Sequence, residues 1–427
     1  MYPEAHEIEK NIGIKFYTTK TPGINGKTRL RLDDFIVKEE AFLQISQEKG
    51  PYCVFLLEKH KLSTLDAIHH ISRRLKLKKN VIGYAGLKDA NAVTLQYISI
   101  PSRLLEGLYD IKQPIIIDDG RIKLKFLGYS YIPISLSILK GNRFIIKIHD
   151  AITQNLCERI ECIKREILLN MGIPSFFGHQ RFGIRRPNTH IIGKYIVLKL
   201  WKEAINELIG HPYPYEHEIL KEARRLAEEG EYNEALKLMP KKFWYERKIL
   251  KLLIEGYKPL EILRRLPRDL LKLFIQAYQS YIYNLILSKR LELGLKPREA
   301  IEGDLVLNIK SGQIRYERMG QLLSQNETIL LPVPGFRIKR LPQHYSWCIV
   351  KEILENEGIN FNSFKINELK IVLHGTLRYT PFQVQHFTYN LSNEQDKTVL
   401  FSFSLDKGMY ATIVLREFMK CDPIHFT

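Results

Sequence analysis

The chain has 427 residues, of which 45% are hydrophobic and 26% are charged, and its formal net charge is +18. This length exceeds one ordinary core and predicts two or three domains. No apolar run reaches the roughly 18 residues of a membrane helix, and the N-terminal MYPEAHEIEK has no apolar signal region. We therefore expect a cytoplasmic protein without a membrane partner. The basic surplus favours nucleic acid as partner, ahead of an acidic membrane surface or a purely solubilising role.

Metal and cofactor chemistry has no motif in this chain. The five cysteines are few, odd in number and scattered, which fits a reducing compartment and argues against a disulfide framework. Neither a second CxxC-like pair nor HExxH is present, and no glycine-rich nucleotide loop follows a strand. We expect no metal and no cofactor.

The first predicted elements alternate between strands and one helix. A strand is expected around residues 35–37 and a buried strand over 52–57. An S-x-x-D capping signal begins at Ser63, with apolar residues at helical spacing after it. Two more strands are expected over 81–85 and 93–100, joined by a loop. This order predicts a mixed α+β sheet.

Helices dominate the middle of the chain. The apolar spacing predicts a helix over 152–171, helical hairpins over 218–253 and a long helix over 269–293. The tail over 398–418 alternates between apolar and polar residues, which predicts a β-hairpin with its turn at 406–408.

The loop between the third and fourth strands carries a single carboxylate in the sequence GYAGLKDANAVTLQ. Asp89 has an ordinary interpretation, in which its side chain closes the loop on a neighbouring N–H. The catalytic interpretation draws on its neighbours, because Gly86 permits close approach of a ligand and Lys88 supplies a cation. Spacing alone leaves both open.

A basic and aromatic segment, FFGHQRFGIRR, follows the first long helix. Aromatic faces and guanidinium planes stack RNA bases, and arginine also contacts phosphate. We predict RNA binding by Arg181, Arg185 and Arg186, with Lys88 as a further contact. In the alternative, the phenylalanines anchor the loop in the core and only Arg185 and Arg186 meet solvent.

Two more positions suit a base pocket. Asn142 and Phe144 stand two residues apart in a predicted strand and so share one face. The amide can read a base edge and the ring can stack on it, although a turn Asn followed by a core Phe is the alternative. Tyr410 in GMYAT has the same ambiguity.

Six segments in this order resemble the sequence blocks of the TruD-type tRNA pseudouridine synthases, and the resemblance runs from about residue 23 to the end. They are DDFIVKEE, AGLKDANAVTLQ, KGNRF, IPSFFGHQRFG, AYQSYIYN and LDKGMYATIVLRE. The resemblance implies an α+β pseudouridine synthase catalytic core with a mixed, largely antiparallel sheet, interrupted by a family-specific inserted α/β domain. Its implied boundaries are 1–170 and 377–427 for the core and 171–376 for the insertion.

The resemblance also implies roles for individual residues. Asp89 takes the place of the nucleophile and Phe35 that of a base-contacting aromatic. Asn142 and Phe144 fall on the substrate pocket. Tyr410 replaces a phenylalanine found in some relatives, which keeps a flat ring and adds a hydroxyl.

Arg29 stands where some relatives carry lysine, which keeps the charge and changes its geometry. We predict Arg29 as the ion-pair partner of Asp89, with Lys88 as second choice.

The implied activity is isomerisation of a specific uridine, uridine 13 in the tRNA D-arm, to pseudouridine. The expected partner is tRNA, with no evident protein partner and a monomer favoured. The alternative function is a non-catalytic RNA-binding protein that retains the fold. The intact GLKDANA sequence argues against it, because a pure binder does not need Asp89.

Overall fold

The computed structural model describes residues 1–106, 113–391 and 397–426. Within these residues nine strands form one sheet, in the order β16-β17-β7-β1-β4-β2-β6-β5, with β3 paired to β4. The strands are β1 (Phe35–Ala41), β2 (Tyr52–His60), β3 (Gly83–Tyr84), β4 (Val93–Pro101), β5 (Ile115–Ile117), β6 (Ile122–Ser130), β7 (Leu139–Ile148), β16 (Gln385–Leu391) and β17 (Val399–Asp406).

The sheet is mixed and largely antiparallel, as predicted. Among its described strands only β1 and β4 pair in parallel. Helix α2 (Thr64–Arg74) begins where the capping signal predicts, since the Ser63 hydroxyl accepts from the N–H of Asp66. The sheet combines strands from both ends of the sequence, because β7 pairs with β17, which lies more than 250 residues later.

The segment between β7 and β16 is mainly helical. Its helices are α3 (Leu156–Leu169), α4 (Thr189–Val197), α5 (Trp201–Ile209), α6 (Glu218–Glu228), α7 (Tyr232–Leu238), α8 (Trp244–Ile254), α9 (Pro259–Arg265), α10 (Arg268–Glu292) and α11 (His344–Asn356). The predicted helices over 152–171 and 269–293 are confirmed as α3 and α10. In the described part of the chain, no helix has the length and apolar character needed to cross a bilayer.

A smaller antiparallel sheet belongs to the same segment. It has the order β10-β9-β12-β15 and consists of β9 (Leu305–Asn308), β10 (Ile314–Tyr316), β12 (Glu327–Val333) and β15 (Thr376–Thr380). Two short pairs accompany it, β8 (Glu299–Ala300) with β11 (Gln321–Leu322) and β13 (Lys365–Ile366) with β14 (Ile371–Val372). The division of the chain near residues 170 and 376 remains a prediction.

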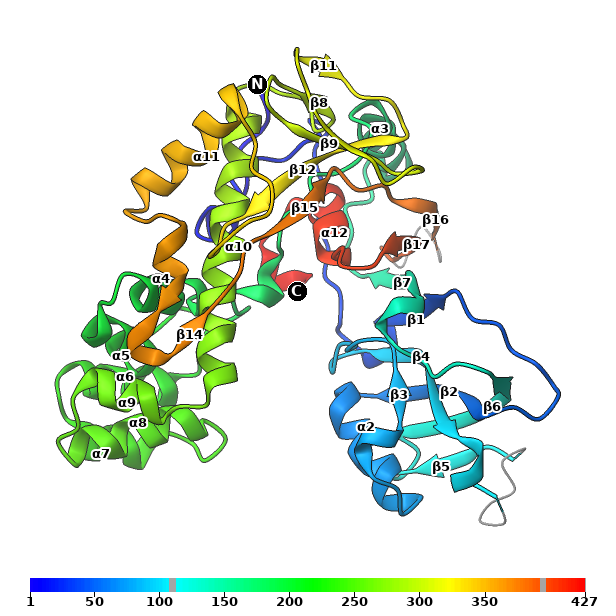
Figure 1. Cartoon of the computed structure of the whole chain (residues 1–427), viewed down its shortest axis with the longest axis horizontal. Coiled ribbons are helices and arrows are strands. Elements are labelled where there is room, and N and C mark those ends of the chain that lie inside the picture. Colours follow the sequence, from blue (N-terminus) through cyan, green and yellow to red (C-terminus); the bar gives the residue numbers. More distant parts are fainter. Residues whose placement is uncertain (107–112, 392–396, 427) are drawn as a thin grey trace.

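Figure 1 shows two bodies that spread apart from a common region. Helices α4–α9 lie on one side, and strands β2–β6 with α2 lie on the other. Helix α10 extends from the helical side toward strands β8–β12, and β15 and α12 (Ala411–Met419) lie between the two bodies.

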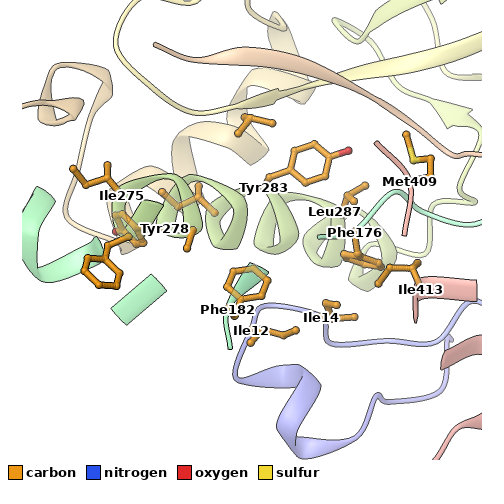
Figure 2. Packing of buried hydrophobic residues seen from close by; sticks show 14 of the residues in the cluster. Ile12, Ile14, Phe176, Phe182, Ile275, Tyr278, Tyr283, Leu287, Met409 and Ile413 are labelled. Atoms are coloured by element: carbon orange, nitrogen blue, oxygen red, sulfur yellow. The ribbon is translucent and has the colours of Figure 1, made fainter. Parts of the chain in front are cut away.

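The main core surrounds α10 and joins distant parts of the sequence. Ile12 of the N-terminal segment, Phe176 and Phe182 of the aromatic loop, and Met409 and Ile413 near the C-terminus belong to one buried cluster. Figure 2 shows these side chains gathered around α10. The predicted alternative that phenylalanines anchor the loop therefore holds for Phe176 and Phe182, which are 1% and 0% exposed.

The predicted C-terminal hairpin is wrong in its second half. Strand β17 ends at Asp406, and the chain then forms α12 instead of a returning strand. All nine residues of α12 are buried, including Arg416 and Glu417, which pair with each other at 2.6 Å. A helix buried on every side shows no helical periodicity of polar residues, so its sequence imitates a strand.

Candidate active site

Asp89 lies in the loop between β3 and β4, and hydrogen bonds from β2 and α2 hold this loop in place. Lys59 of β2 donates from Nζ to the backbone carbonyls of Asp89 at 2.8 Å and of Leu62 at 2.6 Å. The N–H of Lys88 donates to the hydroxyl of Thr64, the first residue of α2, at 2.9 Å. Gly86 adopts a positive φ of 91°, which glycine reaches without strain. The position of the carboxylate is thus fixed by the sheet and by α2.

The Asp89 carboxylate has two side-chain partners. Arg29 Nη2 lies 3.2 Å from Oδ2, and the amide of Gln180 donates to the same oxygen at 3.2 Å. The side chain of Arg29 is 8% exposed and that of Asp89 is 38% exposed. Burial lowers the pKa of Arg29, and the ion pair with Asp89 opposes this shift. Of the two predicted partners, the structure pairs Arg29 with Asp89.

The guanidinium of Arg29 is itself held in place. It donates to the carbonyl of Asn91 at 2.6 Å and lies 3.7 Å above the ring centre of Phe35. A guanidinium over an aromatic face is attracted by the ring quadrupole. One face of Phe35 is therefore occupied by Arg29, so the ring supports the ion pair and presents only its remaining surface to a ligand.

Lys88 turns away from Asp89 into the protein. Its Nζ lies 2.7 Å from the Glu39 carboxylate and donates to Asn142 Oδ1 at 2.7 Å. The Lys88 and Glu39 side chains are 5% and 0% exposed. Burial raises the pKa of Glu39, which the charge of Lys88 opposes. Lys88 ties the loop to β1 and β7, and this buried pairing corrects the prediction that Lys88 is an RNA contact.

A cavity of about 300 Å³ opens beside Asp89, and we call it the aspartate cavity. Asn142 and Phe144 face it from β7, as their spacing predicts, and Tyr410 faces it from the residue before α12. It is lined by Phe35, Val37, Ala85, Gly86, Leu87, Lys88, Asp89, Leu136, Leu139, Asn142, Phe144, Gln180, Gly408, Met409, Tyr410, Ala411 and Thr412.

The predicted RNA-binding arginines lie in three different settings. Arg185 is exposed and makes no ion pair with a described residue. Arg181 is half-buried and donates to Ser280 and Gln276 of α10 at 3.3 and 3.4 Å. Arg186 donates to the carbonyls of Leu208 and Gly210 at the end of α5. Arg186 therefore holds the fold, which corrects its predicted role, and RNA binding by the exposed Arg185 remains a prediction.

Sequence reasoning missed two residues that position this site. Lys59 continues the buried alternation of β2, in which Cys53, Phe55 and Leu57 point into the core. A lysine on that side of a strand was a usable signal. Arg378 of β15 carried no comparable signal, because its partners come from segments far away in the sequence.

Arg378 links two walls of the cavity region. Its Nε donates to the carbonyl of Ser175 at 2.9 Å and its Nη2 to that of Gly408 at 2.9 Å. The guanidinium also lies 4.5 Å from the ring centre of Phe177. The segment that carries Tyr410 is thereby held against the aromatic loop that carries Gln180.

The fold and the site define the class of protein: an α+β protein that presents one ion-paired carboxylate to an aromatic-lined cavity of about 300 Å³. Comparisons with known proteins agree with this class. The family model described as tRNA pseudouridine synthase D (TruD) matches residues 11–418.

Similar proteins span nearly the whole chain. A probable tRNA pseudouridine synthase D of Methanosarcina acetivorans is 35% identical over 453 residues, with 99% of each chain covered. A protein of the same description from Pyrococcus abyssi is 33% identical over 417 residues, covering 95% of this chain and 98% of the relative. The crystal structure of the putative TruD from Methanosarcina mazei has a TM-score of 0.80 at 32% identity, covering 99% of this chain and 100% of that chain. This chain belongs to the tRNA pseudouridine synthase D family, and its enzyme class is that of the isomerases.

Proposed function

We propose that this protein converts a uridine of tRNA, uridine 13 of the D-arm by family resemblance, to pseudouridine with Asp89 as nucleophile. The observation that carries the proposal is the Asp89 carboxylate, paired with Arg29 at 3.2 Å and facing the aspartate cavity. We also expect the protein to act in the cytosol as a monomer.

The aspartate cavity suits a nucleoside turned out of the RNA. Extrusion of a base costs a few kcal/mol, and stacking on one aromatic ring returns about 1–3 kcal/mol. Phe144 and Tyr410 line the cavity and offer ring surface for this purpose. The Asn142 amide accepts from Lys88, which leaves its NH₂ group to donate to a carbonyl oxygen of uracil.

The isomerisation needs no redox partner and no added atom. The Asp89 carboxylate forms a transient bond to the ribose or to the base, and the bond from N1 of uracil to the ribose breaks. The freed base rotates, C5 forms the new bond to the ribose, and the carboxylate leaves. C5 then loses its proton and N1 gains one, so atoms and electrons balance. Arg29, whose Nη2 lies 3.2 Å from Oδ2, holds the orientation of the nucleophilic carboxylate.

The test is the Asp89→Asn variant, because the amide keeps the size of the side chain and removes its nucleophilic charge. With unmodified tRNA and no cofactor, we expect the wild type to form pseudouridine, detected by carbodiimide-based mapping. We expect the variant to form none while its tRNA affinity stays within a few-fold of wild type. The matched control is Asp119→Asn, an exposed aspartate outside the aspartate cavity, which should leave turnover unchanged.

Two results would count against this function. Near-normal turnover by Asp89→Asn would remove Asp89 from the mechanism. Tight tRNA binding by the wild type without any pseudouridine in the transcript would instead indicate a binding protein that retains the fold.

A further inference from the structure

A second and larger cavity lies in the helical body, away from Asp89. Its volume is about 700 Å³, and its lining residues come from α4, α6, α8 and the segments that precede them. We call it the helical cavity. Among the described residues that line the two cavities, none is shared.

The cations inside the helical cavity are already paired. Arg224 Nε lies 2.8 Å from the Glu216 carboxylate, and Arg186 is engaged by backbone carbonyls. Arg185 and Lys242 also line the cavity, but both are exposed and neither makes an ion pair with a described residue. The cavity thus presents two solvent-exposed positive charges, and the Lys242 ammonium lies 5.4 Å from the ring centre of Phe243.

The walls of the helical cavity suit a flat ring with polar edges. Phe243, Tyr245 and Leu220 supply apolar and aromatic surface, and each is partly exposed. Glu246 adds a carboxyl group that is 1% exposed. Burial raises the pKa of Tyr245, so its phenol stays protonated. Stacking surface with a few polar groups and cations at the entrance is the combination that binds a nucleotide.

A short piece of chain connects this cavity to the aspartate cavity. Gln180 donates to the Asp89 carboxylate, and Arg185 lines the helical cavity five residues later. Five residues span at most about 18 Å. One RNA molecule can therefore reach both cavities.

We propose that the helical cavity binds one unpaired nucleotide of the same tRNA whose uridine enters the aspartate cavity. Arg185 and Lys242 contact its phosphates, and its base packs against Phe243 and Tyr245. The identity of the RNA rests on the proposed function, while the cavity and its chemistry do not. Exposed cations beside aromatic walls fit a nucleotide better than a peptide, because its phosphate then meets Arg185 and Lys242 while its base meets the aromatic rings.

The first test uses a series of unmodified tRNA transcripts, each with one abasic nucleotide. Dissociation constants are measured with Asp89→Asn protein, so that turnover does not alter the RNA, and with Phe243→Ala added to it. We expect one position other than the target uridine at which loss of the base weakens binding about tenfold. At that position Phe243→Ala should add no further loss, whereas the two effects should add at all other positions.

The second test removes the free cations. Arg185→Ala with Lys242→Ala should weaken tRNA binding about tenfold and reduce the magnitude of the salt slope by between one and two. The matched control is Lys251→Ala with Lys310→Ala, two exposed lysines that make no ion pair with a described residue and do not line the cavity. If the Phe243→Ala protein lacks a cooperative melting transition, the Arg185→Ala/Lys242→Ala protein replaces it in the measurements with the abasic transcripts.

Strict additivity at every non-target position, or equal losses for the control pair, would overturn the proposal. Both readouts measure binding and not turnover. Failure of the second site would therefore leave pseudouridine formation by the wild type intact, and failure of the proposed function would leave the binding result interpretable.

Discussion

Lys59 shows how one buried charge organises the reactive loop. Its side chain is fully buried, and its ammonium donates to the carbonyls of Asp89 and Leu62. Burial lowers the pKa of Lys59 to about 8, which the negative charge of Asp89 partly opposes. A charge kept under these conditions costs folding free energy, so its value lies in holding the loop.

We predict that Lys59→Met changes the pH dependence of stability. Between pH 8 and 10.5, Lys59 has lost its proton in the folded protein and keeps it in the unfolded chain. The free energy of unfolding of the wild-type protein therefore rises with pH in this window. Methionine removes this contribution. Relative to the variant, the wild type should gain about 1–2 kcal/mol from pH 7 to pH 10, less than a fully desolvated group would give.

Urea unfolding at a series of pH values measures this difference. The control is Lys251→Met, an exposed lysine of α8. Parallel stability curves for wild type and Lys59→Met would show that Lys59 is not perturbed. The variant should also turn over tRNA more slowly, because the Asp89 loop loses its anchor.

Most of the aspartate site was predictable residue by residue, but the pairing of its cations was not. Asp89, Asn142, Phe144 and Tyr410 come together as the family blocks predict. The sequence could not show that Lys88 forms an ion pair with Glu39, since that contact depends on how the loop packs against β1. A count of basic residues does not separate those that face solvent from those that serve the core.

At the level of elements, Arg378 holds the segment between β17 and α12 in the position where it lines the aspartate cavity. Gly408 lies in the turn, and its carbonyl accepts from Arg378 of β15 at 2.9 Å. The same guanidinium holds Ser175 and stacks on Phe177. We class Arg378 as a positioning residue, because it does not line the aspartate cavity and contacts the segment that carries Tyr410.

We predict that Arg378→Lys lowers kcat for pseudouridine formation by about tenfold while tRNA affinity changes little. Lysine keeps the charge, but it cannot bond both carbonyls and stack in the same geometry. Single-turnover rates and dissociation constants separate the two effects. Arg143→Lys is the control, since Arg143 is exposed on the opposite face of β7 from Asn142. A loss of affinity equal to the loss of rate would indicate a direct RNA contact instead.

Elements with a polar side were predictable, and those buried all round were not. Helix α2 has a capping serine and an exposed face, so its start follows from the sequence. Helix α12 has neither signal, because every one of its nine residues is buried. Helices α6 to α8 were predicted as hairpins from their alternating apolar and charged faces, and the structure divides them at Gly230 and Pro240.

On the scale of the whole molecule, segments from both ends of the sequence pack against distant parts of the chain. Strand β17 approaches β7 so tightly that a Cβ on Gly141 would lie 2.1 Å from the Leu405 carbonyl oxygen. The N-terminal segment is fixed as well, since Glu9 pairs with buried Arg416 of α12 at 2.8 Å. Such long-range contacts explain why a local pattern gives no sign of the discontinuous sheet.

The net charge of +18 leads to a prediction for the complete protein. Each phosphate neutralised by a lysine or arginine contributes about −0.7 to −0.9 to the slope of log affinity against log salt. With several such contacts along the path between the two cavities, we expect a slope between about −3 and −6 for unmodified tRNA. The measurement is a binding titration of Asp89→Asn protein at increasing chloride concentration. Wild type at matched early times should give the same slope, because the proposed role of Asp89 is contact with the nucleoside and not with the phosphates. A slope near zero would mean that the basic surplus does not bind RNA, and that affinity comes from the cavities alone.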